Sequence, residues 1–112
     1  MTDKTSSGFV TVFVTAANKD EADVIARTLV QERLVACANV MDGIRSYFQW
    51  EGDVQAEDEV VLLAKTRSAL FSDIEDRVKE LHSYDCPCIV AWPIEVGSAD
   101  YLAWIEAETK AK

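Results

Sequence analysis

The 112-residue chain has few of the residues that mark several common classes of protein. It contains three cysteines, an odd number and too few for a disulfide framework, and a single histidine. No run is long and apolar enough to span a bilayer, and the first eight residues, MTDKTSSG, lack the apolar core of a signal peptide. These absences predict a soluble cytoplasmic protein with free thiols and no membrane partner.

Positive charge is also scarce, because 11 Lys and Arg stand against 20 Asp and Glu, for a net charge of −9. The basic residues are scattered rather than gathered in a stripe, so the sequence predicts no nucleic-acid partner. Hydrophobic residues make up 49% of the chain, enough for one packed core. We expect a disordered tail over residues 1–8 and one domain over residues 9–112.

The hydrophobic pattern predicts four strands and three helices. Strands are expected over residues 9–16, 35–50 with a kink at 41–43, 59–66 and 88–97, and helices over 18–34, from 68 to 82–85, and from 98 onward. A turn at 51–53, with Gly52 at positive φ, makes residues 35–66 one long hairpin. Asn18, with Glu21 reaching back to it, is expected to cap the first helix, and Ser68 and Ser98 the other two.

This order of elements is typical of an α+β fold, the ferredoxin-like β-α-β-β-α-β sandwich with an added C-terminal helix. Such a fold places two helices on one face of the sheet and leaves the other face bare in a monomer. The chain also holds more aromatic residues than one small core needs, among them Tyr47, Phe48, Trp50, Trp92 and Trp104. A surplus of this kind predicts an interface between subunits.

The stretch LHSYDCPC, residues 81–88, is the densest group of metal-binding residue types, since it holds His82, Cys86 and Cys88. Imidazole and thiolate are the ligands that copper and zinc prefer, and residues two apart in a strand point to the same side. The sequence therefore predicts a copper or zinc site that is not required for folding. The alternative is a histidine that suits the end of a helix, followed by two cysteines that only pack.

We predict no enzymatic activity. Cys37 lies in the middle of the strand VACANV, far in sequence from the one histidine, and a buried thiol is its simpler interpretation. The chain has no Gly-rich phosphate loop and no G-x-S-x-G segment. Glu57, Asp58 and Glu59 are expected on a solvated flank of the hairpin.

Several segments, in order and at matching separations, resemble the CutA family of divalent-cation tolerance proteins. They are VTA (14–16), ERLVACANV (32–40), SYFQWEGDV (46–54), LLAKT (62–66), HSYDCPCI (82–89) and DYLAWI (100–105). The resemblance implies the same fold and a homotrimer in which the long hairpin of one subunit extends the sheet of its neighbour. The chain departs from the family at Ser83 and Cys88, which usually are Pro and Glu, and at Val14 and Leu81, where copper ligands are expected.

The resemblance implies a role in tolerance to divalent metals, through weak binding of copper or zinc. One alternative is a non-enzymatic signalling or scaffold module, similar in architecture to the trimeric PII proteins, with a small molecule bound between subunits. Another is an assembly core whose partner carries the function. The candidate residues for a ligand cleft between subunits are Cys37, Trp50, Tyr84, Tyr101 and Trp104.

Overall fold

The computed structural model describes residues 8–111 and contains four strands and three α-helices. In chain order these are β1 (Phe9–Ala16), α1 (Lys19–Gln31), β2 (Cys37–Trp50), β3 (Asp53–Arg67), a 3₁₀ turn (Ser68–Leu70), α2 (Phe71–Leu81), β4 (Ile89–Pro93) and α3 (Ala99–Glu108). This order confirms the predicted fold class. Residues 1–7 of the predicted tail lie outside the described residues. Gly8 belongs to the folded chain, because its carbonyl accepts the N–H of Ser68 at 2.8 Å.

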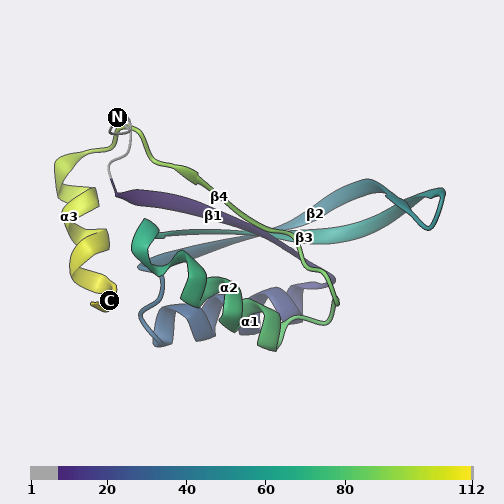
Figure 1. Cartoon of the computed structure of the whole chain (residues 1–112), viewed down its shortest axis with the longest axis horizontal. Helices are drawn as coiled ribbons and strands as arrows, with labels where there is room; N and C mark the ends of the chain where they lie inside the picture. Colours follow the sequence, from purple (N-terminus) through teal and green to yellow (C-terminus); the bar gives the residue numbers. More distant parts are fainter. Residues whose placement is uncertain (1–7, 112) are drawn as a thin grey trace.

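The strands form one antiparallel sheet in the order β2-β3-β1-β4 (Figure 1). The edge strand β4 ends at Pro93, in the edge position that a residue without an N–H favours. It is shorter than predicted, because β1 begins at Phe9 and accepts a last hydrogen bond there from Ile94. The chain beyond Ile94 therefore has no strand to pair with.

The hairpin of β2 and β3 is confirmed, and it reaches well beyond the helices (Figure 1). β3 begins at Asp53 rather than at residue 59, because residues 53–59 pair with β2 alone, while β1 joins only from Val60 onward. The predicted kink is a bulge between Met41 and Ile44. Gly52 has a φ of 88°, as the turn at the tip was predicted to require.

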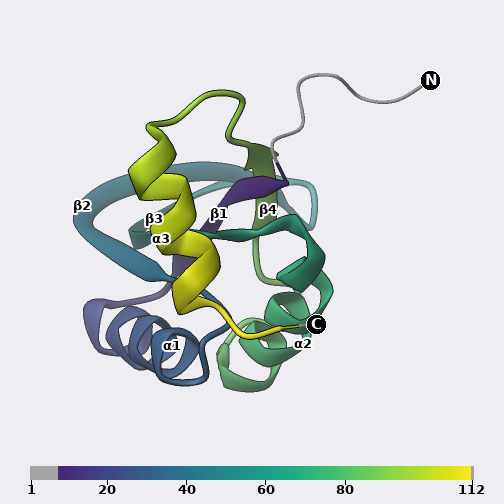
Figure 2. The ribbon, with the colours of Figure 1, turned by 90° about the vertical axis from the view of Figure 1, so that its left-hand side faces the viewer.

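Helices α1 and α2 lie side by side on one face of the sheet (Figures 1 and 2). The core lies between them and the sheet, because alternate residues of β1 and β3 point toward the apolar sides of both helices. Its fully buried side chains include Val12, Val14, Ile25, Leu29, Leu62, Leu70, Ile74 and Val78. One continuous apolar cluster of this kind holds the two layers together.

The predicted caps and ends of the helices are confirmed in part. Asn18 accepts the N–H of Glu21 at 2.8 Å, and Ser98 accepts that of Tyr101, so both predicted caps are confirmed. The cap predicted at Ser68 is wrong, because a 3₁₀ turn intervenes and Leu70 precedes α2 without a side-chain cap. The first helix ends three residues early, at Gln31, and the chain turns away at Arg33, which has a φ of 60°.

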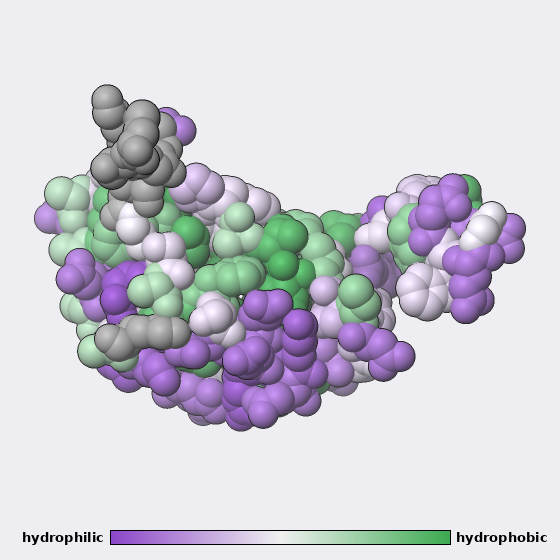
Figure 3. All heavy atoms as spheres, viewed as in Figure 1, coloured by the Kyte–Doolittle hydropathy of each residue, from purple (hydrophilic) through white to green (hydrophobic). Residues whose placement is uncertain are grey.

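Of the helices that the structure describes, only α3 lies on the opposite face of the sheet, at the end away from the hairpin tip (Figures 1 and 2). Ile105 anchors this helix and is fully buried. The rest of this face exposes large apolar side chains, including Met41, Val90 and Trp92. Figure 3 shows apolar residues gathered along the sheet and hydrophilic ones over the two core helices. Among residues 8–111, no helix has the length and apolar character needed to cross a membrane.

Candidate functional site

A cavity of about 790 Å³ opens on the face of the sheet opposite α1 and α2, between the hairpin, β1 and the loop 82–88. We call it the sheet cavity. Its walls include aromatic side chains, carboxylates and thiols, from Phe13, Phe48, Trp50, Gln55, Glu57, Glu59, Tyr84, Asp85, Cys86 and Cys88. The loop that was predicted to bind metal therefore forms one wall of this cavity.

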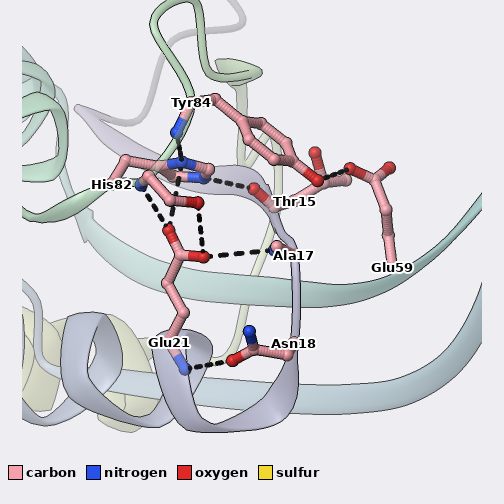
Figure 4. Close-up of polar contacts among 8 residues, drawn as sticks. Thr15, Ala17, Asn18, Glu21, Glu59, His82 and Tyr84 are labelled. Carbon is pink, nitrogen blue, oxygen red and sulfur yellow. Dashed lines mark hydrogen bonds and ion pairs between the residues drawn. The ribbon is translucent and has the colours of Figure 1, made fainter.

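His82 lies behind this wall, with its side chain fully buried. It ends α2, and its ring nitrogens both have partners (Figure 4). Nε2 is 2.7 Å from the carbonyl oxygen of Thr15, and Nδ1 is 3.0 Å from the backbone nitrogen of Tyr84. Because a carbonyl can only accept, Nε2 donates to Thr15 and Nδ1 accepts the N–H of Tyr84. Neither nitrogen is free for a metal ion unless one of these bonds breaks.

Glu21 joins α1 to the same loop, a role that the sequence did not reveal. The Glu21 carboxylate accepts two hydrogen bonds from Ser83, one from its backbone N–H at 2.6 Å and one from its hydroxyl at 2.9 Å. The same carboxylate lies 3.2 Å from Nδ1 of His82 (Figure 4). Burial alone would raise the pKa of Glu21. The hydrogen bonds from Ser83, together with the charge of His82 when it is protonated, outweigh burial and lower the pKa below 4.5. The expected bond back to Asn18 is absent, and the carboxylate instead faces the N–H of Ala17 at 3.4 Å.

Glu59 corrects a second expectation, since it is buried rather than solvated, with 8% of its surface exposed. Its carboxylate accepts the hydroxyls of Ser46 at 2.6 Å and Tyr84 at 2.8 Å (Figure 4 shows the bond to Tyr84). Burial, and then this bond to a carboxylate, raises the pKa of Tyr84 to about 12. The sequence contained a signal for the burial of Glu59, because this residue directly precedes the apolar run Val60–Leu63 of a strand expected to be central.

Cys86 and Cys88 are both exposed and line the sheet cavity. They precede β4 rather than belong to it, yet they face the same space, as their spacing suggested. Burial, and then the negative charge of Glu59, raises the pKa of the Cys88 thiol. Within residues 8–111, no three His, Cys, Asp or Glu side chains are arranged to hold a metal ion together. The metal site thus stays a prediction, and His82 lies outside the cavity that contains the two thiols.

The five candidates for a ligand cleft fall into two groups. Trp50 and Tyr84 line the sheet cavity. Cys37, Tyr101 and Trp104 meet at α3, where the Cys37 sulfur lies 3.3 Å from the Tyr101 hydroxyl and the two rings stack at 5.6 Å. The hydrogen bond with Cys37, and then burial, raises the pKa of Tyr101 to about 12. Since Cys37 and Trp50 begin and end β2, roughly 40 Å of extended chain separates them, so one subunit cannot bring them together.

Comparison with known proteins identifies the chain's relatives. The family model for the CutA1 divalent ion tolerance protein matches residues 10–108. The divalent-cation tolerance protein CutA of Archaeoglobus fulgidus is 43% identical over 85% of this chain and 92% of its own length. Its solved structure, described as that of a periplasmic protein, aligns with a TM-score of 0.89 at 40% identity and covers 91% of this chain and 99% of that one.

The relatives differ in length and in stated location. The chloroplastic CutA protein of Arabidopsis thaliana is 40% identical over 90% of this chain, which spans only 56% of that longer protein. The shared segment is therefore the whole ferredoxin-like domain, and extensions lie outside it. These names place relatives in a chloroplast and a periplasm, so the cytoplasmic location of this chain stays a prediction. The family is named for tolerance of divalent ions and not for a reaction.

Proposed function

Because this chain belongs to the CutA1 family of divalent ion tolerance proteins, we propose that it acts in metal tolerance as a homotrimer that binds copper or zinc ions weakly. The observation that carries the metal proposal is the placement of Cys86 and Cys88 in one cavity with the carboxylates of Glu57 and Glu59. Thiolates select zinc and cuprous ions over harder cations, and the nearby negative charge favours any cation.

The donor set fits a weak site better than a storage site. Two thiols supply half of the tetrahedral shell that zinc prefers, and solvent has to complete it. A metal ion must also displace the proton of Cys88, whose pKa is raised by burial and by Glu59. Folding does not depend on the ion in this proposal, because the continuous apolar core lies on the other side of the sheet. His82 acts as a support for the loop rather than as a ligand.

Calorimetric titration tests the site with zinc, and with copper kept cuprous under anaerobic conditions, on reduced and chelator-treated protein. We expect binding to the wild type and its loss in the Cys86→Ser/Cys88→Ser variant. Cys37→Ser is the matched control, because it removes a thiol that lies outside the cavity. Equal binding by the wild type and the double variant would overturn the proposal, as would no binding at all.

The outer hairpin supports the trimer. Within the part of the chain that the structure describes, residues 44–59 pair only with each other, and a two-stranded ribbon is marginally stable alone. This ribbon exposes 70% of Tyr47 and 66% of Val54, which a neighbouring subunit would cover. A ring in which each hairpin meets the α3 end of the next chain would also bring together Trp50 and Tyr101 from different subunits. Light scattering should give a molar mass of about three times 12.5 kDa. A monomer in dilute solution would contradict the proposed trimer.

The proposal includes no catalytic step and places the protein in the cytoplasm. A catalytic thiol needs a base beside it, but Cys37 contacts a tyrosine, while His82 uses both nitrogens in structural bonds. The three free cysteines suit a reducing compartment.

A second candidate is the non-enzymatic module that binds a small molecule, and the size of the sheet cavity favours it. About 790 Å³ is in the range of pockets that enclose organic ligands and far exceeds what one metal ion occupies. A thermal-shift screen of chelator-treated protein against metabolites addresses this candidate. A stabilising metabolite supports it, and a screen without one leaves metal binding as the function.

A further inference from the structure

The Nδ1 atom of His82 lies close to two groups that require opposite protonation states (Figure 4). The backbone N–H of Tyr84, 3.0 Å away, can bond only to an unprotonated Nδ1, whereas the Glu21 carboxylate, 3.2 Å away, can bond only to a protonated one. Nε2 is the same in both states, because it needs its proton to donate to the carbonyl of Thr15. Nδ1 can therefore satisfy only one of its two neighbours at a time.

In the neutral ring, Nδ1 and the carboxylate are two acceptors that face each other. Nδ1 accepts the N–H of Tyr84, so no proton lies between it and Oε2 of Glu21. The carboxylate is held at this distance by the N–H and the hydroxyl of Ser83. The contact is unfavourable at low local dielectric, and here the His82 side chain is fully buried and only 12% of the Glu21 side chain is exposed. One proton on Nδ1 would turn this repulsion into a charge-assisted hydrogen bond.

The elements around the imidazole contribute few charges that could oppose this proton. Helix α1 contributes Glu21, β1 contributes the uncharged carbonyl of Thr15, and the loop contributes the ring of Tyr84, whose centroid is 4.7 Å from that of the imidazole. Lys79, the basic residue in the last turn of α2, pairs with Glu75 at 3.1 Å. The charged group in contact with the imidazole is therefore a carboxylate.

Glu21 is ready to receive the proton's charge. Burial acts to raise the pKa of Glu21, but the hydrogen bonds from Ser83 and the charge of His82 when it is protonated outweigh burial and lower that pKa. The carboxylate is thus ionised over the range in which histidines titrate. Among residues 8–111, no lysine or arginine forms an ion pair with Glu21, or with Glu59 behind Tyr84.

We infer that His82 is a pH-sensitive switch between α1 and the loop 82–88. When Nδ1 takes up a proton, it releases the N–H of Tyr84 and donates to Glu21, so the end of α2 is tied to α1 and the Tyr84 backbone loses its bond. The released residue carries a ring that lines the sheet cavity. All of the switching atoms belong to one chain, and the metal proposal rests on Cys86 and Cys88, so the switch is independent of assembly and of metal binding.

The test is a titration of full-length, metal-free protein from about pH 8 to about pH 5, followed by ¹⁵N NMR. The chain has one histidine, so the ring signals belong to His82. We expect Nε2 to be protonated throughout and Nδ1 to gain its proton within this range. The hydrogen-exchange protection of the Tyr84 amide should then fall about tenfold, as for the loss of one hydrogen bond. The His82 amide, which donates to Val78 at 2.9 Å, should keep its protection.

Two variants test the partner of Nδ1. Glu21→Gln keeps an oxygen acceptor but removes the charge that stabilises the protonated ring. At the pH where half of the wild-type rings are doubly protonated, this variant should lower the ratio of charged to neutral rings about tenfold. Glu32→Gln is the matched control, because it removes the same charge at the C-cap of α1, where the partner is Arg77. The control should leave the ratio within about twofold.

The other outcomes each overturn the inference. A ring that keeps one protonation state over the whole titration is not a switch, and a Tyr84 amide that stays protected after Nδ1 is protonated is not coupled to it. Equal ratios in the wild type and Glu21→Gln would show that Glu21 does not receive the proton. Equal lowering by Glu21→Gln and Glu32→Gln would show an effect of overall negative charge. The wild-type titration decides the first two outcomes even if Glu21→Gln does not fold.

Discussion

Two sites that share the loop 82–88 differ in almost every physical respect. The His82 side chain is fully buried, and both of its ring nitrogens have partners within the protein. In the sheet cavity four residues further on, Cys86 and Cys88 are exposed, and Glu57 is unpaired among the described residues. A polar group with all of its bonds made inside the protein stabilises the fold, and one without partners is available to a ligand.

The difference teaches that residue type alone does not identify a metal ligand. By residue type, His82 and the two cysteines are equally suitable metal ligands. The histidine, however, is the C-cap of α2, and its ring forms hydrogen bonds with the backbone of Thr15 and of Tyr84. The cysteines follow in a loop that faces open space. We therefore expect changes at the two sites to have separable effects, on stability at the first and on ligand binding at the second.

The largest expected effect is that of His82→Ala on stability. It removes two backbone contacts from a fully buried ring and leaves a void, so the free energy of unfolding should fall by about 2–4 kcal/mol. Urea denaturation of metal-free protein measures it. Lys79→Ala is the control on the same helix, and it should cost less than about 0.5 kcal/mol, because its ion pair with Glu75 is exposed. Unchanged stability together with lost zinc binding would make His82 a ligand after all.

The fold could be predicted from the sequence because each element depends on local signals. The apolar runs, the Asn18 and Ser98 caps, and Pro93 at a sheet edge are properties of short segments, and the structure confirms them. The helix errors, the cap at Ser68 and the end of α1, were local, whereas the strand errors arose where the length of a strand depends on its partner. β4 is short because β1 starts at Phe9, and β3 is long because the hairpin pairs with itself.

The site was less predictable, because its contacts join residues far apart in the chain. Glu21 meets Ser83 across 62 positions, and Glu59 meets Tyr84 across 25. Periodicity indicates which face a residue occupies but not which side chain from another element faces it. The cluster of His82 with the cysteines was visible in the sequence, whereas the burial that separates their roles was not.

The second largest effect should distinguish two glutamates of one strand. Glu59→Gln exchanges a carboxylate with two hydroxyl donors for an amide that can accept only through one oxygen, so it should lower the free energy of unfolding by about 1–2 kcal/mol. Glu57→Gln, its matched control two residues away, should change it by less than about 0.5 kcal/mol, because Glu57 is exposed. Thermal or urea unfolding measures both, and equal losses would mean that the cavity depends on charge rather than on the bonds of Glu59.

A third effect should appear only at alkaline pH. Tyr84 has a pKa of about 12 in the folded protein against an ordinary 10.0, so the unfolded chain loses its proton first. Its contribution is therefore complete below pH 10 and is lost as the pH rises toward 12, and the free energy of unfolding falls over that window. In the Tyr84→Phe variant, the free energy of unfolding should fall less over this pH range. The remaining decrease comes from Tyr101, whose pKa is also about 12.

Urea midpoints across the same window measure this effect, with Tyr47→Phe as the matched control because Tyr47 is 70% exposed on the hairpin. An identical alkaline slope in the wild type and Tyr84→Phe would show that the bond from Tyr84 to Glu59 does not couple to folding.

The smallest effect is expected from the cysteines, and it decides whether they pack or bind. Both thiols are exposed, and replacing sulfur by oxygen there leaves no buried void, so Cys86→Ser/Cys88→Ser should change the free energy of unfolding by less than about 0.5 kcal/mol without metal. Urea unfolding in chelator measures it. With zinc present, the wild type should gain stability and the variant should not, because only an ion that binds the folded state shifts the equilibrium. A large loss in chelator would instead make the cysteines structural, and the contrast with His82 would disappear.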